Sequence, residues 1–218
     1  SSPRLTNSKI TNNTGMGVYS YGCSGTYLYN LFDGNSYIPM WYNIGDVVQH
    51  CTFTGNGGPL TIWNGKLENC LVADNLDAGL QTWWGSTVEL VNVTIANNQT
   101  SGIAYFGNNL TLTNCIVSGN AESIYNHFSD TVYTYYSNIN YPEAMGTGSI
   151  ARDPKFVDGN NNNYSLMASS FCINSGHPDS TDSDGTRADM GAYPYLNSYN
   201  GTDWHVAIDG DDVLGTGE

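Results

Sequence analysis

The stretch Leu110–Asn120 reads LTLTNCIVSGN, and it decides the fold. The same order of residue types stands 22 residues earlier as VELVNVTIANN, at Val88–Asn98, and again as GKLENCLVADN, at Gly65–Asn75. Each copy holds an apolar residue, then Asn, then a small residue, then an aliphatic residue, then a closing Asn. Self-similarity at a fixed period indicates a repeat architecture.

The repeat extends well beyond these three copies. Its closing asparagines are Asn13, Asn35, Asn56, Asn75, Asn98 and Asn120, at intervals of 22, 21, 19, 23 and 22 residues. Six residues before each close stands a second row: Asn7, Tyr29, His50, Asn69, Asn92 and Asn114. Helical repeats need a periodicity of ~3.6 and about 33 or more residues per unit, so they are excluded. The pattern predicts an all-β, single-stranded right-handed parallel β-helix with three short strands per ~22-residue rung and an irregular C-terminal cap.

Stacking of like residues on like explains the repeated letters, because parallel strands lie ~4.8 Å apart. The second-row Asn is predicted at a tight bend in left-handed geometry, and its stacked copies are predicted to form an amide ladder along the core. Two further slots are predicted to form core stacks. They hold Ser8, Cys51, Cys70, Val93 and Cys115, and then Ile10, Phe53, Val72, Ile95 and Val117. The three cysteines are interpreted as small buried hydrophobes rather than as ligands or disulfide partners.

These rungs resemble the right-handed parallel β-helix repeats of bacterial surface proteins. The resemblance continues in DPKFVDGNNNNYSLMASSFCINSG, at 153–176, and in DSDGTRADMGAYPY, at 182–195. These stretches are similar to the DPxFVD…DxDGxRxDxGAY closing segment of that family, although Phe171 stands where Pro is usual. The resemblance implies a fold and not a function, because binders, lyases and hydrolases share this architecture.

Three regions are predicted along the chain. Residues 1–137 are β-helix rungs, 138–195 are closing rungs and a cap, and 196–218 are a linker and the start of a following module. The resemblance implies a segment of a longer protein that is secreted or displayed on a cell surface.

Composition excludes some partners. The 218 residues carry a net charge of −14, with only 6 Lys and Arg, so no basic patch is available to bind nucleic acid. No apolar run approaches the ~20 residues of a membrane span. The chain is 39% hydrophobic and 12% aromatic, which is sufficient for a folded core.

An aromatic row is the first candidate site. An apolar residue follows each closing Asn, and an aromatic stands three residues later, in pairs such as Leu60 with Trp63 and Leu80 with Trp83. Alternation along a strand places the aromatic outward if the apolar residue points inward. The predicted row is Tyr21, Trp41, Trp63, Trp83 and Phe106, with His127 as an extension. Such a row is either a platform for the apolar faces of pyranose rings or a structural aromatic ladder covered by another segment.

An acidic turn is the second candidate site. Asp179, Asp182, Asp184 and Asp189 supply the oxygen ligands that Ca²⁺ prefers, although the EF-hand spacing is absent. The alternative is a cap in which Arg187 pairs with Asp189 or Asp153. Calcium is the one cofactor that the sequence suggests.

Catalytic motifs are weak, so the enzyme question stays open and leans towards no. A lyase needs a base on the substrate-facing sheet, and a hydrolase needs two carboxylates about 5–9 Å apart. The best carboxylate pair in the rungs is Asp74 with Asp77. We therefore predict a non-catalytic module for surface display or adhesion that binds a polysaccharide or cell-surface glycan. The alternatives are a polysaccharide lyase or glycoside hydrolase, and a stalk or filament subunit that contacts copies of itself or neighbouring modules.

Overall fold

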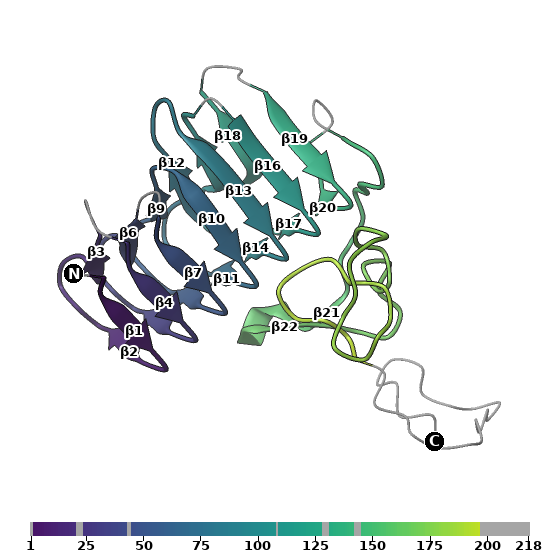
Figure 1. Cartoon of the computed structure of the whole chain (residues 1–218), viewed down its shortest axis with the longest axis horizontal. Helices are drawn as coiled ribbons and strands as arrows, with labels where there is room; N and C mark the ends of the chain where they lie inside the picture. Colours follow the sequence, from purple (N-terminus) through teal and green to yellow (C-terminus); the bar gives the residue numbers. More distant parts are fainter. Residues whose placement is uncertain are drawn as a thin grey trace.

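The computed structural model describes residues 2–20, 24–42, 45–107, 109–127, 131–141 and 145–196. Within these residues the chain winds as a solenoid, and each coil adds one short strand to each of three parallel sheets (Figure 1). The fold is therefore the predicted all-β parallel β-helix.

The three sheets are named A, B and C here. Sheet A contains β1 (Arg4–Thr6), β4 (Thr26–Leu28), β7 (Val47–Gln49), β10 (Gly65–Glu68), β13 (Thr87–Val91), β16 (Asn109–Thr113) and β19 (Val132–Tyr135). Sheet B contains β2 (Lys9–Thr11), β5 (Leu31–Asp33), β8 (Thr52–Thr54), β11 (Leu71–Ala73), β14 (Thr94–Ala96), β17 (Ile116–Ser118) and β20 (Asn138–Ile139). Sheet C contains β3 (Val18–Tyr19), β6 (Met40–Tyr42), β9 (Leu60–Ile62), β12 (Leu80–Thr82), β15 (Ser101–Tyr105) and β18 (Glu122–Asn126).

Left-handed residues make the corners of each coil. The corner between sheets A and B is occupied by the predicted second row, with φ between 50° and 58° from Asn7 to Asn114. The corner after sheet B uses Asn12, Gly34, Gly55, Asp74, Asn97 and Gly119, also at positive φ. Asn, Asp and Gly tolerate this geometry best. The prediction of left-handed geometry is confirmed, including at Tyr29 in the least regular copy.

The buried amide ladder is formed by the closing asparagines and not by the corner ones. Asn35, Asn56, Asn75 and Asn98 are at most 2% exposed. Each side-chain oxygen from Asn35 to Asn120 accepts the Nδ2 of the preceding closing Asn, at 2.8–3.0 Å. It also accepts that residue's backbone N–H, at 2.9–3.2 Å. The expected ladder of corner asparagines is confirmed only from Asn69 to Asn114, where Asn92 donates to Asn69 and Asn114 to Asn92. Tyr29 and His50 interrupt this row, so it is not continuous as the closing row is.

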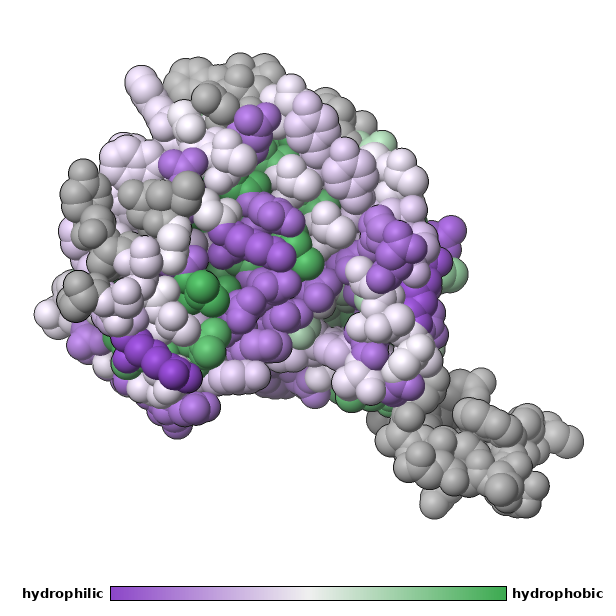
Figure 2. Space-filling model, in the orientation of Figure 1, coloured by the Kyte–Doolittle hydropathy of each residue, from purple (hydrophilic) through white to green (hydrophobic). Residues whose placement is uncertain are grey.

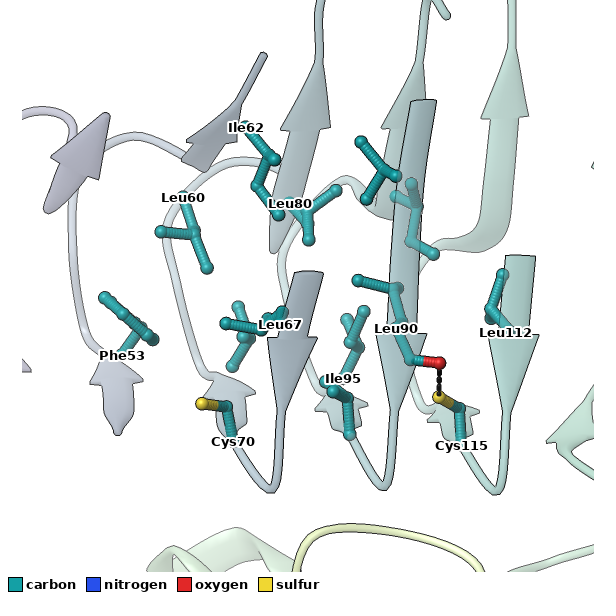
Figure 3. Close-up of a cluster of buried hydrophobic side chains, with 14 of the residues drawn as sticks. Phe53, Leu60, Ile62, Leu67, Cys70, Leu80, Leu90, Ile95, Leu112 and Cys115 are labelled. Atoms are coloured by element: carbon teal, nitrogen blue, oxygen red, sulfur yellow. Dashed lines mark hydrogen bonds between the residues drawn. The ribbon is translucent and has the colours of Figure 1, made fainter. Parts of the chain in front are cut away.

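The interior is a narrow apolar column. Phe32, Phe53, Val72, Ile95 and Val117 are aligned in successive strands of sheet B and are at most 2% exposed. Leucines of sheets A and C face them, and Cys70 and Cys115 lie at the rim of the column (Figure 3). Cys51, Cys70, Cys115 and Cys172 are buried and free. Both predicted core stacks are confirmed.

The C-terminal segment packs mainly against the side of the solenoid. Ile150 still bridges Asn138 at the last coil, but the antiparallel pair β21 (Phe156–Asp158) and β22 (Asn163–Leu166), with the short 3-10 helix η2 (Gly159–Asn161), turns back below sheet B (Figure 1). Tyr164 packs on Leu71, Ala73 and Ala96, which are outward residues of β11 and β14. Leu166, Cys172 and Met190 pack on Ile116 of β17.

This lateral packing corrects the expectation of a segment that simply closes the end of the solenoid. The reason lies in the strands that it covers, because the outward residues Leu71, Ala73 and Ala96 of β11 and β14 are apolar. An outward apolar face of this kind needs a covering layer.

Candidate functional site

Sheet C presents an aromatic outer face, and its alternation is as predicted. Met40, Leu60, Leu80 and Ile103 lie in register, point inward and are 0% exposed. The residues one and three positions later therefore point outward.

The outward side chains form two rows instead of one. Trp63, Trp83, Phe106 and His127 each follow an inward residue of sheet C by three positions and form the first row. Trp41 lies in the second row, directly beside Tyr19, because Met40 and not Ile38 occupies the inward position of that coil. Tyr125 also belongs to the second row. Tyr21 lies outside the described residues.

A count from the closing Asn identifies the correct position for Trp41. Met40 lies five residues after Asn35, as Leu80 lies five after Asn75. Val18 also lies five residues after its closing Asn, Asn13, so the same count would have found Tyr19, which the sequence interpretation missed. It would not have found Tyr125, because Ile124 lies only four residues after Asn120.

The first aromatic cluster is built around Trp41. Its ring stacks on that of Trp83, with centroids 5.6 Å apart and planes at 4°. Tyr19 meets Trp41 edge-on, at 5.1 Å and 82°. Each indole therefore covers part of one face of the other, so Trp41 contributes little free ring surface.

The second cluster contains Phe106, Tyr125 and His127. Phe106 lies 5.2 Å from the His127 ring and 6.1 Å from the Tyr125 ring. The Tyr125 hydroxyl is 3.2 Å from His127 Nδ1 and shares a hydrogen bond with it. This pair places a hydroxyl and an imidazole in contact on the outer face of sheet C.

The aromatic surface that remains open lies at the edges of these clusters. Trp83 is 42% exposed, Trp84 68% and Tyr125 43%. Single exposed aromatic rings are common on protein surfaces, whereas exposed rings gathered on one face are typical of interaction sites. The single flat platform that the sequence predicted is replaced by two clusters, whose most exposed members are Tyr19, at 54%, Trp83 and Tyr125.

The predicted acidic turn has its carboxylates bonded to the backbone. Asp189 is 3% exposed, and its two oxygens accept the N–H groups of Asn174 at 2.7 Å and Tyr195 at 2.6 Å. Asp182 accepts the N–H of Asp189 at 2.9 Å, and Asp184 accepts the N–H and hydroxyl of Thr186. Burial raises the pKa of both Asp182 and Asp189, against the opposing effect of these hydrogen bonds.

The remaining contacts of the turn do not follow the predicted salt bridge. Arg187 Nε donates to the Gly176 carbonyl at 2.7 Å, and its guanidinium lies 5.6 Å from the Tyr136 ring. Asp153 pairs with Lys155 at 3.1 Å. Asp179 is close to His177, at 4.0 Å. Among the described residues, no group of three His, Cys, Asp or Glu side chains is placed to hold a metal ion. Calcium binding stays a prediction.

The candidate carboxylate pair is engaged elsewhere. Asp74 accepts the hydroxyl of Tyr164 at 2.7 Å, which ties the C-terminal segment to the corner after β11. Asp77 accepts the N–H of Ala78 at 2.8 Å and the hydroxyl of Thr100 at 3.1 Å. Both residues have a structural role in the turns.

Two other surfaces are less distinctive. The face seen in Figure 2 is a mixture of polar side chains and small apolar spots. A polar pocket of about 740 Å³ lies at the last coils, between Ala121–Ile124 and Ala151–Asp153. Its lining combines amides and hydroxyls with the charged side chains of Glu122, Arg152 and Asp153.

The chain belongs to the right-handed β-helix family. The sequence model described as "Right handed beta helix region" matches residues 1–139, which agrees with the coils of the structure. No curated protein and no solved structure matches the chain. No helix among the described residues is long and apolar enough to cross a lipid bilayer.

Proposed function

We propose that this chain is a non-catalytic β-helix module of a secreted or surface-displayed protein that holds polysaccharide against the outer face of sheet C. The supporting observation is the pair of aromatic clusters on that face, in which Tyr19, Trp83 and Tyr125 are 54%, 42% and 43% exposed. Pyranose rings present apolar C–H faces, and desolvating them against indole is favourable.

The net charge of the chain indicates which class of polysaccharide it can bind. At a net charge of −14, a polyuronate or sulfated chain would be repelled unless a cation bridged it. We therefore propose a neutral polysaccharide as the ligand, bound without a requirement for calcium.

Affinity electrophoresis in gels containing neutral or acidic polysaccharides tests the proposal. We expect a neutral polysaccharide to retard the chain, and Trp63→Ala/Trp83→Ala to bind it about tenfold more weakly. The matched control is Tyr133→Ala, because Tyr133 is an equally exposed aromatic, at 43%, on the outer face of sheet A. Retardation that survives the double substitution, or that Tyr133→Ala removes equally, would contradict the proposal.

The wild-type chain and its variants also distinguish this proposal from the two alternatives, an enzyme and a stalk or filament subunit. The Tyr125–His127 contact is the observation that favours a lyase or hydrolase, because it places a hydrogen-bonded base among the aromatics. Depolymerisation that Tyr125→Phe and His127→Ala abolish would establish the enzyme. A stalk or filament subunit predicts self-association in sedimentation experiments that Trp83→Ala weakens.

A further inference from the structure

Two buried thiols occupy adjacent copies of one slot in the solenoid. Cys51 and Cys70 precede β8 and β11, whose residues Thr52 and Leu71 are register partners. They are 1% and 0% exposed, and both are free. The next copy is Val93, so Cys115 has no cysteine in either neighbouring coil, where Val93 and Ser137 stand.

The contacts bring the two sulfur atoms together. The backbone N–H of Cys51 donates to Cys70 Sγ at 3.3 Å, and the two side chains are themselves within hydrogen-bonding contact. Adjacent parallel strands are ~4.8 Å apart, which lies inside the ~4.4–6.8 Å range of Cα separations in disulfides.

The surroundings of the two thiols also shift their pKa values in opposite directions. A hydrogen bond from the Cys70 side chain lowers the pKa of Cys51, and Asn30 Nδ2 approaches Cys51 Sγ at 3.9 Å. Burial raises the pKa of Cys70 well above its ordinary value. Cys51 is therefore the better nucleophile of the pair, since the thiolate is the reactive form.

We propose that Cys51 and Cys70 are an oxidation site. A low-molecular-weight disulfide oxidises the two thiols, and the Cys51–Cys70 disulfide that forms links the two coils. Cys51 thiolate attacks one sulfur of the small disulfide and releases a small thiolate, which takes up a proton. Cys70 then loses its proton, attacks Cys51 Sγ and releases the second small thiol. One small disulfide is thus reduced to two thiols while the two protein thiols lose two electrons and two protons. The burial of both residues restricts the reaction to folding or to local opening of the coil.

Refolding of the full chain in oxidised and reduced glutathione, followed by alkylation and peptide mapping, tests this site. Cleavage with trypsin and a Glu-specific protease leaves Cys51 in 10–66, Cys70 in 69–89 and Cys115 in 90–122. We expect 10–66 linked to 69–89, and a loss of the link in Cys51→Ser. That result would also exclude Cys23, which shares the first peptide. Ser is a suitable replacement because Ser8 and Ser137 occupy the same slot in other coils.

Stability gives a second, independent readout. The link closes a loop of about 19 residues, so oxidation is expected to raise Tm by roughly 5–10 °C in the wild type. Cys115→Ser is the matched control, because it removes a thiol from the same slot and should keep both the link and the Tm increase. The proposal is overturned if 69–89 stays unlinked, if it pairs with another peptide, or if Cys51→Ser responds to oxidation as the wild type does.

Discussion

The two rows of asparagines stand at the two ends of the sheet B strand in each coil, as Asn69 and Asn75 flank β11, and they have different structural roles. The closing row, from Asn13 to Asn120, is largely buried and forms a continuous chain of side-chain hydrogen bonds. The corner row, from Asn7 to Asn114, is less buried except at Asn114, which is 1% exposed and which the C-terminal segment covers. This row is bonded in only part of its length, where Asn92 donates to Asn69 and Asn114 to Asn92, each at 3.0 Å. In the other coils the corner is Tyr29 stacked on His50, with ring centroids 4.7 Å apart.

The difference shows which property of Asn each position uses. The closing row needs an amide that donates and accepts at once, and only Asn appears there in the six copies. The corner row needs a residue that tolerates φ near 53°, and Tyr and His also occupy it. A buried amide without partners costs more than strain at a corner.

Asn75→Ala should have the largest effect. It removes the acceptor of the Asn56 N–H and Nδ2, both at 3.0 Å, and the donor to the Phe53 carbonyl at 3.2 Å. The donor to Asn98 Oδ1, at 2.9 Å, is lost as well. Because four buried hydrogen bonds are removed together, we expect the free energy of unfolding to fall by about 3–5 kcal/mol. Urea denaturation followed by fluorescence measures it. A loss below ~1 kcal/mol would mean that water enters the ladder and replaces the amide.

Asn69→Ala should have a smaller effect. It removes one part-buried hydrogen bond, from Asn92, and replaces Asn by a residue that tolerates φ 53° less well. Together these changes cost about 1–2 kcal/mol. Asn69→Gly relieves the backbone strain and should recover most of this loss. Asn75→Gly, in contrast, should be no better than Asn75→Ala. Equal behaviour of Gly at the two positions would remove the distinction between the rows.

The smallest expected effect is a change in how the free energy of unfolding depends on pH, caused by Asp74 at the corner after sheet B. Burial raises the pKa of Asp74 above its ordinary value of 3.8, against hydrogen bonds from Tyr164 and Asn97. The folded chain then holds this proton more tightly than the unfolded chain does. The resulting stability is present below pH 3.8 and is lost as the pH rises through the folded pKa.

Two substitutions should change the slope of stability against pH in opposite directions. Asp74→Asn keeps a residue that tolerates the left-handed corner and an acceptor for the Tyr164 hydroxyl, so the decline of stability above pH ~4 should flatten. Tyr164→Phe removes a hydrogen bond that lowers the Asp74 pKa, so the decline should become steeper and extend to higher pH. Urea midpoints measured at several pH values test both, and an unchanged slope in Asp74→Asn would contradict the assignment.

Local patterns predicted the parts of this fold that depend on one coil at a time. The bends, the inward column from Phe53 to Val117 and the outward direction of Trp63, Trp83 and Phe106 follow from alternation and from the period, because each coil repeats the environment of the last. The position of Trp41 depended on choosing between Ile38 and Met40 as the inward residue. The number of residues from Asn35 favours Met40, which lies five residues after this closing Asn, as Leu80 lies five after Asn75, whereas Ile38 lies only three after Asn35.

The predicted calcium site and glycan face depend on contacts that span many residues. Asp189 binds the N–H groups of Asn174 and Tyr195, and no local pattern shows that its oxygens are already engaged. The stack of Trp41 on Trp83 is likewise invisible in the sequence, because the two indoles come from coils that are not adjacent.

The sequence by itself determined the solenoid, its period, its corners and its core, since stacked coils convert a linear repeat directly into columns of like residues. Only the tertiary structure decided which Asn row is buried, which indoles cover each other and where the C-terminal segment lies. The last of these depended on the apolar outer face of β11 and β14, which a segment about 90 residues further along the chain covers. Such pairings follow from the shape and polarity of complete surfaces, and a surface exists only after the coils have stacked.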